Sequence, residues 1–192
     1  MRGTSPDANC LMAELLWVLM LFQSNVGAAK KRESIELVWS WSGESLGVDH
    51  SLLTDEVLLG IGNSGPRYIR HRDLELGLLI GLGLDLTRQP QAERAALLSD
   101  RERFERWLVD IPQEGYRQFR HMFRYLAFPD FNERITQNRD RVLILGAYNG
   151  TDSKAIRAIS DAQQDDALRN LREKLAVEHG TEDLDFYATP LV

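Results

Sequence analysis

The segment 117–141, RQFRHMFRYLAFPDFNERITQNRDR, concentrates side chains that bind anions. A guanidinium group matches the oxygens of a phosphate, so arginines on one surface are typical of proteins that contact a nucleic-acid backbone. The candidate DNA-contacting residues are Arg117, Arg120, His121, Arg124, Arg134, Arg139 and Arg141. The alternative is a solvated helix face whose arginines pair with acidic residues of neighbouring helices.

A helix over 114–128 would divide this segment into two faces. At 100° per residue, the apolar side chains that gather on one side are Tyr116, Phe119, Met122, Phe123 and Leu126. The cationic side chains that gather on a different side are Arg117, Arg120, His121 and Arg124. Pro129 ends the helix. The spacing therefore predicts a core-facing side and a basic side, which the three later arginines extend.

A second pattern resembles the catalytic residues of a metal-dependent nuclease. Asp130 follows Pro129, and the sequence Asp152-Ser153-Lys154 comes about twenty residues later. Such nucleases need two acidic ligands and a lysine on adjacent strands, so that a metal ion can activate water; 142–148 (VLILGAY) would be one strand. The favoured alternative is structural, because Asp152 suits the N-cap of a helix and Pro129 suits a helix end.

A third pattern, GxGxxG over 60–65, occurs in dinucleotide-binding proteins, and Asp85 follows at the distance of a ribose-binding acid. That site requires a strand before the glycines, whereas TDEVLL (54–59) begins a helix. We therefore favour a loop between helices. The sequence contains no GxxxxGK[ST] phosphate-binding loop, so we expect no nucleotide hydrolysis, no catalytic residue and no cofactor in this chain. Its four histidines and Cys10 lack the spacing of metal ligands.

Composition limits the class of protein. The chain has 192 residues, 43% hydrophobic and 27% charged, which suits one globular domain or a domain with a terminal appendage. Its net charge of −6 argues against an autonomous, non-specific nucleic-acid binder. The segment 101–150 nevertheless holds nine arginines against seven acidic residues, so an anionic partner would meet it first.

The apolar segment 10–22, CLMAELLWVLMLF, is shorter than the roughly 20 residues that span a bilayer. Glu14 interrupts it, so we predict a buried first helix and no membrane partner. The single cysteine, Cys10, excludes an internal disulfide and suits a reducing compartment, which predicts a cytoplasmic location.

Hydrophobic periodicity predicts a mainly α, multi-helix globular domain. The predicted helices cover 9–23, 28–41, 55–61, 71–87, 92–100, 100–111, 114–128 and 152–178, with Asn9 as the N-cap of the first and Gly180 after the end of the last. The segments 71–87 and 136–148 also fit buried strands, which leaves a minor β element open. We predict a helical domain over 1–150, followed over 151–192 by a long helix and an acidic, then apolar, tail.

Several stretches resemble the N-terminal, pre-ATPase region of McrB-like AAA+ proteins of modification-dependent restriction systems. The clearest is YRQFRHMFRYLAFPDFNERITQNRDR (116–141). Similar wording occurs in MAELLWVLMLFQSNVGAAKKR (12–32), WSWSGES (39–45), LLTDEVLLGIGNSG (52–65) and LREKLAVEHGTEDLDFYATPLV (171–192). HRDLELG (71–77) departs from the family, which has an aromatic-containing stretch there.

The resemblance implies a function. In that family an AAA+ motor works with a separate nuclease, and the N-terminal region supplies target recognition or coupling. The resemblance therefore implies a non-catalytic recognition or coupling module, truncated before the missing AAA+ domain, that contacts DNA phosphates and partners a motor or nuclease subunit. The alternatives are a structural helical adaptor that docks to such a subunit and, less favoured, the nuclease.

Overall fold

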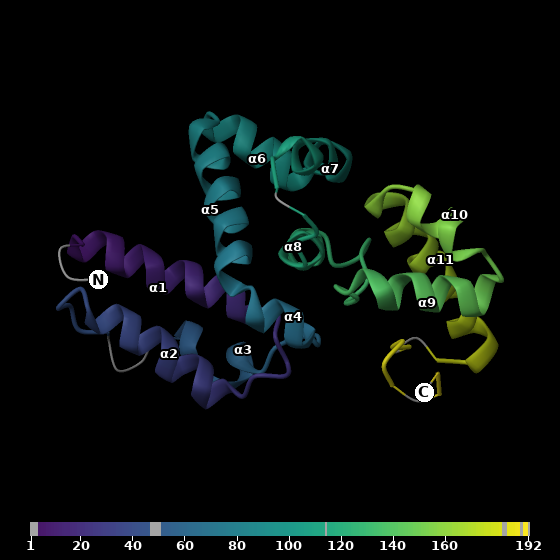
Figure 1. Cartoon of the computed structure of the whole chain (residues 1–192), viewed down its shortest axis with the longest axis horizontal. Coiled ribbons are helices and arrows are strands. Elements are labelled where there is room, and N and C mark those ends of the chain that lie inside the picture. Colours follow the sequence, from purple (N-terminus) through teal and green to yellow (C-terminus); the bar gives the residue numbers. More distant parts are fainter. Residues whose placement is uncertain (1–3, 47–50, 114, 182–183, 189, 192) are drawn as a thin grey trace. The chain divides into compact units, whose positions relative to one another are not determined.

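A computed structural model describes residues 4–46, 51–113, 115–181, 184–188 and 190–191. Within these residues the chain forms α-helices, and no strand is present among them apart from an isolated parallel bridge between Gln23 and Gly62. The predicted mainly α class is confirmed. The chain divides into two compact units, unit 1 up to Arg120 and unit 2 from His121, and each is described by itself (Figure 1).

Unit 1 begins with a hairpin of two helices, α1 (Pro6–Leu21) and α2 (Ala28–Ser40), which pack side by side (Figure 1). The hydroxyl of Ser5, not Asn9, caps α1 by accepting from the Ala8 amide. Asn9 is buried and donates to the Trp41 carbonyl at 3.0 Å. The core of this hairpin consists of Ala13, Met20, Ile35, Val38, Leu53 and Leu58. No helix among the described residues is both long and apolar enough to cross a membrane.

The glycine-rich loop at 60–65 fastens the end of α1. The amides of Ile61 and Gly62 both donate to the Phe22 carbonyl at 2.9 Å, and the Ser24 amide donates to Gly62. Gly60 has φ +85°, and a Cβ there would lie 2.2 Å from the Gln23 carbonyl oxygen. This glycine is therefore required by close backbone approach, and the loop joins helices as expected.

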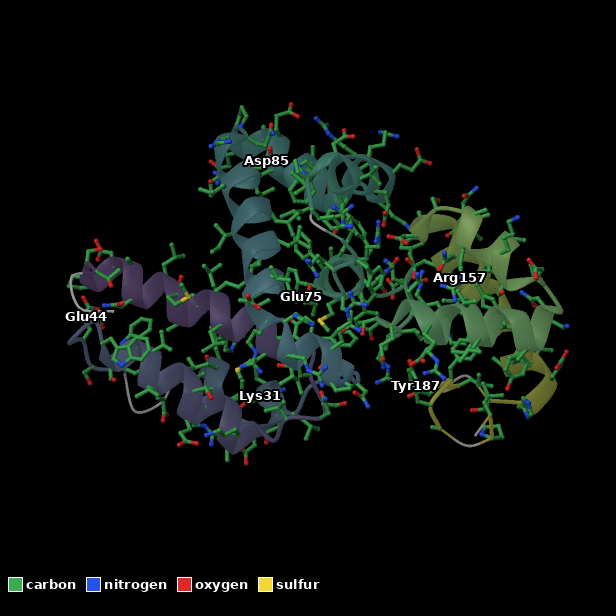
Figure 2. All side chains as sticks on the ribbon, in the orientation of Figure 1. Lys31, Glu44, Glu75, Asp85, Arg157 and Tyr187 are labelled. Carbon is green, nitrogen blue, oxygen red and sulfur yellow. The ribbon has the colours of Figure 1, made fainter. Side chains whose placement is uncertain are left out.

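The rest of unit 1 is helical on both sides of this loop. A 3-10 turn at Ser51–Leu53 and the short α3 (Asp55–Leu58) precede it, and α4 (Gly65–Arg70), α5 (Arg72–Arg88), α6 (Gln91–Ser99) and α7 (Arg101–Asp110) follow it. The ambiguous segment 71–87 is thus helical. Asp100 caps α7 through the Arg103 amide, as its sequence position suggests. Asp85 accepts from the Trp107 indole at 2.6 Å, which gives it a packing role (Figure 2).

The helix α8 (Phe119–Ala127) begins five residues later than predicted. The buried carboxylate of Glu75 in α5 accepts from the Gln118 amide at 3.2 Å and from the Phe119 amide at 3.0 Å. A carboxylate at this end of a helix satisfies free amides and opposes the positive end of the helix dipole. A tertiary contact within unit 1, which extends to Arg120, therefore fixes where α8 starts.

Unit 2 continues from α8 with α9 (Asn138–Asn149), α10 (Ser153–Ala158) and α11 (Asp161–His179). The segment 142–148 is helical, so of the helix and the strand that the sequence left open, the helix is the one that forms. Predicted helix 152–178 is two helices, because Ser160 and Gln163 form a capping box that starts α11. Gly180 ends α11 at φ +66°, as predicted.

The core of unit 2 combines helices from before and after residue 150, where the sequence analysis places the end of its helical domain. It is built from α9, α10, α11 and the C-terminal segment, with Ile135, Val142, Leu145, Ile156, Leu168, Leu171, Leu175, Leu184 and Phe186 buried together. Helix α9 therefore shares its apolar face with the helices that follow it.

A pair of glycine substitutions tests the loop. Gly60→Ala should lower the free energy of unfolding of unit 1 by at least about 2 kcal/mol, because the added Cβ meets backbone and φ is positive. Gly77→Ala, in α5 where no atom lies within 4 Å of the position that a Cβ would take, should raise it by up to about 1 kcal/mol. Urea unfolding followed by tryptophan fluorescence measures both, and equal effects would contradict the assigned role of the loop.

Candidate functional site

The structure places most of the candidate DNA-contacting residues below the surface. Arg139 is exposed and Arg134 is half-buried. The buried ones, with their exposed fractions, are Arg117 (8%), Arg120 (6%), His121 (3%), Arg124 (1%) and Arg141 (0%). The expectation that these five form an exposed basic surface is therefore wrong. Their hydrogen bonds and ion pairs give the physical reason.

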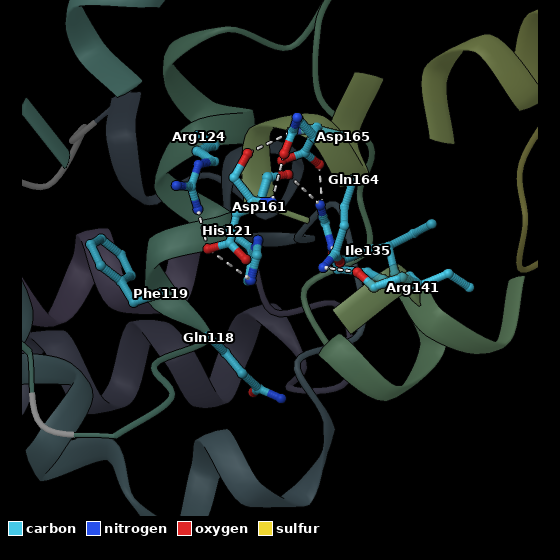
Figure 3. Close-up of polar contacts among 12 residues, drawn as sticks. Gln118, Phe119, His121, Arg124, Ile135, Arg141, Asp161, Gln164 and Asp165 are labelled. Carbon is cyan, nitrogen blue, oxygen red and sulfur yellow. Dashed lines mark hydrogen bonds and ion pairs between the residues drawn. The ribbon is translucent and has the colours of Figure 1, made fainter. Parts of the chain in front are cut away.

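In unit 2, two of these residues converge on Asp161 in the first turn of α11 (Figure 3). The Arg124 guanidinium donates to its carboxylate at 3.1 Å, and His121 Nε2 lies 3.9 Å from the same oxygen. A carboxylate in the first turn also interacts favourably with the helix dipole. Arg124 and Asp161 thus join α8 to α11.

Arg141 has hydrogen-bond partners on α11 and in the segment before α9 (Figure 3). Its guanidinium donates to Asp165 Oδ1 at 2.7 Å, to Gln164 Oε1 at 3.3 Å, and to the carbonyls of Ile135 at 3.2 Å and Asp161 at 3.1 Å. Burial raises the pKa of the Asp165 carboxyl, and the charge of Arg141 opposes that rise. A buried guanidinium with these partners has a structural role, because it has no exposed face for a phosphate.

In unit 1, the remaining two buried arginines also have internal partners. Arg120 donates to the Ile111 carbonyl at 2.8 Å, and Arg117 donates to the Tyr116 carbonyl at 3.0 Å. Burial raises the pKa of Glu75, while its bonds to the Phe119 and Gln118 amides and the nearby charge of Arg117 act in the opposite direction. Arg117 therefore helps keep the carboxylate that starts α8 ionised.

The residues of the nuclease pattern have separate structural positions. Asp152 caps α10, accepting from the Lys154 amide at 2.9 Å and the Ala155 amide at 3.3 Å. Asp130 is exposed in the turn after α8. Across the residues that the structure describes, no three His, Cys, Asp or Glu side chains gather in a way that would hold a metal ion. The capping interpretation of Asp152 is confirmed.

An apolar pocket of about 300 Å³ opens in unit 1 between α1 and α2. Its walls are Ala13, Glu14, Trp17, Val18, Ile35, Trp39, Leu46, Leu52 and Leu53. The Trp17 indole donates to the Leu52 carbonyl at 2.8 Å, which fixes one wall. The tryptophans of the hairpin are the sequence feature that could have indicated this pocket. Helical periodicity alone assigns them to the core.

Lys31 of α2 is a buried residue that the sequence analysis does not single out. Its side chain is fully buried, and Nζ donates to the Leu58 carbonyl at 2.7 Å (Figure 2). Burial lowers its pKa to about 8. The lysine therefore ties α2 to α3 at the cost of burying a cation.

No family model, curated protein or solved structure matches the chain. What the chain does has to be inferred from its own geometry. That geometry combines buried, internally paired arginines with several open pockets, among them the apolar one in unit 1 and a polar one in unit 2.

Removing one partner of the buried ion pair should destabilise unit 2. Arg141→Met should lower the free energy of opening of α9 and α11 by about 3–5 kcal/mol, because it leaves Asp165 buried and unpaired. The double variant Arg141→Met/Asp165→Leu should recover most of the loss. Hydrogen exchange of the α9 and α11 amides measures this, with Arg139→Met as the exposed control. Equal protection in Arg141→Met and Arg139→Met would contradict the assignment.

Proposed function

We propose that the chain is a non-catalytic coupling module of an McrB-like restriction system. It docks a protein partner through the apolar pocket of unit 1. The observation that carries the proposal is the pocket itself, about 300 Å³ and walled by two tryptophans and several aliphatic side chains. Apolar, partly open pockets of this kind take the anchor residues of a partner helix.

The charge around the pocket favours a protein over DNA. Glu14 is the charged residue in its wall, and α1 contains two acidic residues, Asp7 and Glu14, and no lysine or arginine. A glutamate in the wall repels phosphate and attracts lysine or arginine. The complementary partner is therefore an amphipathic helix with an apolar ridge and a basic flank.

The family resemblance supports a proposal for the identity of that partner. The stretches 12–32 and 39–45 that resemble the McrB-like region lie on α1, α2 and the turn after α2, which frame the pocket. Such regions accompany an AAA+ motor and a nuclease. We therefore assign the partner helix to a motor or nuclease subunit, and to this chain a coupling role without nucleotide hydrolysis.

DNA recognition by this chain is the competing function, and the burial of five candidate arginine and histidine side chains weighs against it. Of the seven residues, Arg139 alone is exposed, and Arg134 pairs with Asp185 at 2.5 Å. A set of phosphate contacts strong enough for binding requires several accessible cations. The coupling role requires none.

Site-specific cross-linking tests the docking site. The full chain, carrying a photoreactive phenylalanine at Leu52 in the pocket wall, is irradiated in its native host. The expected product joins it to a protein that contains a Walker A motif or a nuclease domain, because the pocket receives a helix of that partner. Mass spectrometry identifies the product.

The control places the same probe at Val109 of α7, which is 62% exposed and away from the pocket walls. Identical products from both positions, or none from Leu52, would refute the docking site. Binding of the purified chain to labelled duplex DNA across a salt series separates the competing function. Affinity that falls steeply with salt and weakens in Arg139→Ala would favour DNA recognition.

A further inference from the structure

A polar pocket of about 260 Å³ lies within unit 2, between α8, α11 and the C-terminal segment. The polar residues in its wall are Tyr125, Asn132, Glu133, Arg134, Arg172 and Asp185. The coupling role uses none of them. Their hydrogen bonds leave particular donors and acceptors available, and these define what the pocket can bind.

Asn132 presents an acceptor without a partner. Its side chain is 4% exposed, and Nδ2 donates to the Arg124 carbonyl at 3.1 Å and the Phe128 carbonyl at 2.8 Å. These two bonds fix the orientation of the amide group. Oδ1 is buried and has no hydrogen-bond partner in the described part of the chain. Buried acceptors are normally satisfied, so a ligand that donates a hydrogen bond is expected here.

Glu133, the next residue, supplies a second acceptor. Its side chain is 11% exposed, and Oε1 accepts from Arg172 Nε at 2.7 Å. That bond occupies one carboxylate oxygen and leaves Oε2 as an acceptor. Burial raises the pKa of Glu133, and the bond to Arg172 opposes the rise. A cationic donor beside Oε2 would further favour the ionised carboxylate.

Arg172 supplies donors for an anion. Its bond to Glu133 uses Nε, so the two terminal nitrogens remain as donors on a side chain that is 29% exposed. The other ion pair in the wall joins Arg134 to Asp185. Two cations and two anions balance, so the pocket does not select a ligand of net charge. It instead offers acceptors and donors side by side.

We propose that this pocket binds a small zwitterion, a free α-amino acid. Its ammonium group donates to Asn132 Oδ1 and Glu133, and its carboxylate accepts from Arg172. Tyr125 and Leu184 form the part of the pocket wall that would contact the side chain of the bound amino acid. The volume lies just below the usual range of about 300–1,000 Å³ for drug-sized ligands, which suits a molecule of amino-acid size. The site is independent of the proposed docking pocket.

Isothermal titration calorimetry of the full chain tests the proposal, with each of the common free amino acids as the probe at pH 7. At least one should bind saturably. Its decarboxylated amine and its deaminated acid should each bind at least about tenfold more weakly, because each lacks one of the two charges. No saturable heat from any amino acid up to about 10 mM, or an analogue that binds as tightly as the parent, would overturn the proposal.

Variants then place the binding in this pocket. Glu133→Gln keeps the shape of the side chain, and Arg172→Met removes the carboxylate contact, so each should weaken binding about tenfold. Arg157→Gln, an exposed arginine of α10 outside the pocket, should leave affinity unchanged (Figure 2). Circular dichroism melting checks that each variant folds. If Arg172→Met does not fold, the affinity of Glu133→Gln tests the assignment. Wild-type affinity in a folded Glu133→Gln would overturn the assignment.

Discussion

The guanidinium group of Arg141 is fully buried in unit 2, and its need for hydrogen-bond partners constrains how the helices of that unit pack. Its partners are Asp165 and Gln164 of α11 and the carbonyls of Ile135 and Asp161. A buried cation without such partners costs several kcal/mol, so the packing of α9 against α11 has to supply them. Arg124 and Asp161 repeat the arrangement between α8 and α11.

The same constraint changes the functional meaning of the arginine-rich segment. Its buried arginines direct their hydrogen bonds into the protein, so they do not form the cationic surface that phosphate binding would use. The accessible chemistry lies elsewhere, in an apolar pocket of unit 1 and a polar pocket of unit 2. This is why we propose docking of a protein partner as the function of the chain.

Local signals in the sequence predicted the helices well. The second helix, predicted at 28–41, occurs at Ala28–Ser40, and Gly180 ends the last helix as expected. The break at Ser160 was also local, since SDAQ (160–163) is a capping box that the helical period obscured. The burial of Arg141 was not predictable, because it depends on α11 bringing Asp165 beside it. Likewise, Glu75 starts α8 from about 44 positions earlier in the chain.

Arginine-specific labelling of the folded chain with phenylglyoxal, read by mass spectrometry, tests the central claim most directly. That claim is that the buried arginines of 117–141 are internal structural residues. Exposed Arg139 and Arg157 should be modified at least about tenfold faster than Arg124 and Arg141, which react only after local opening. Modification of Arg124 and Arg141 at the rate of Arg139 would contradict the account.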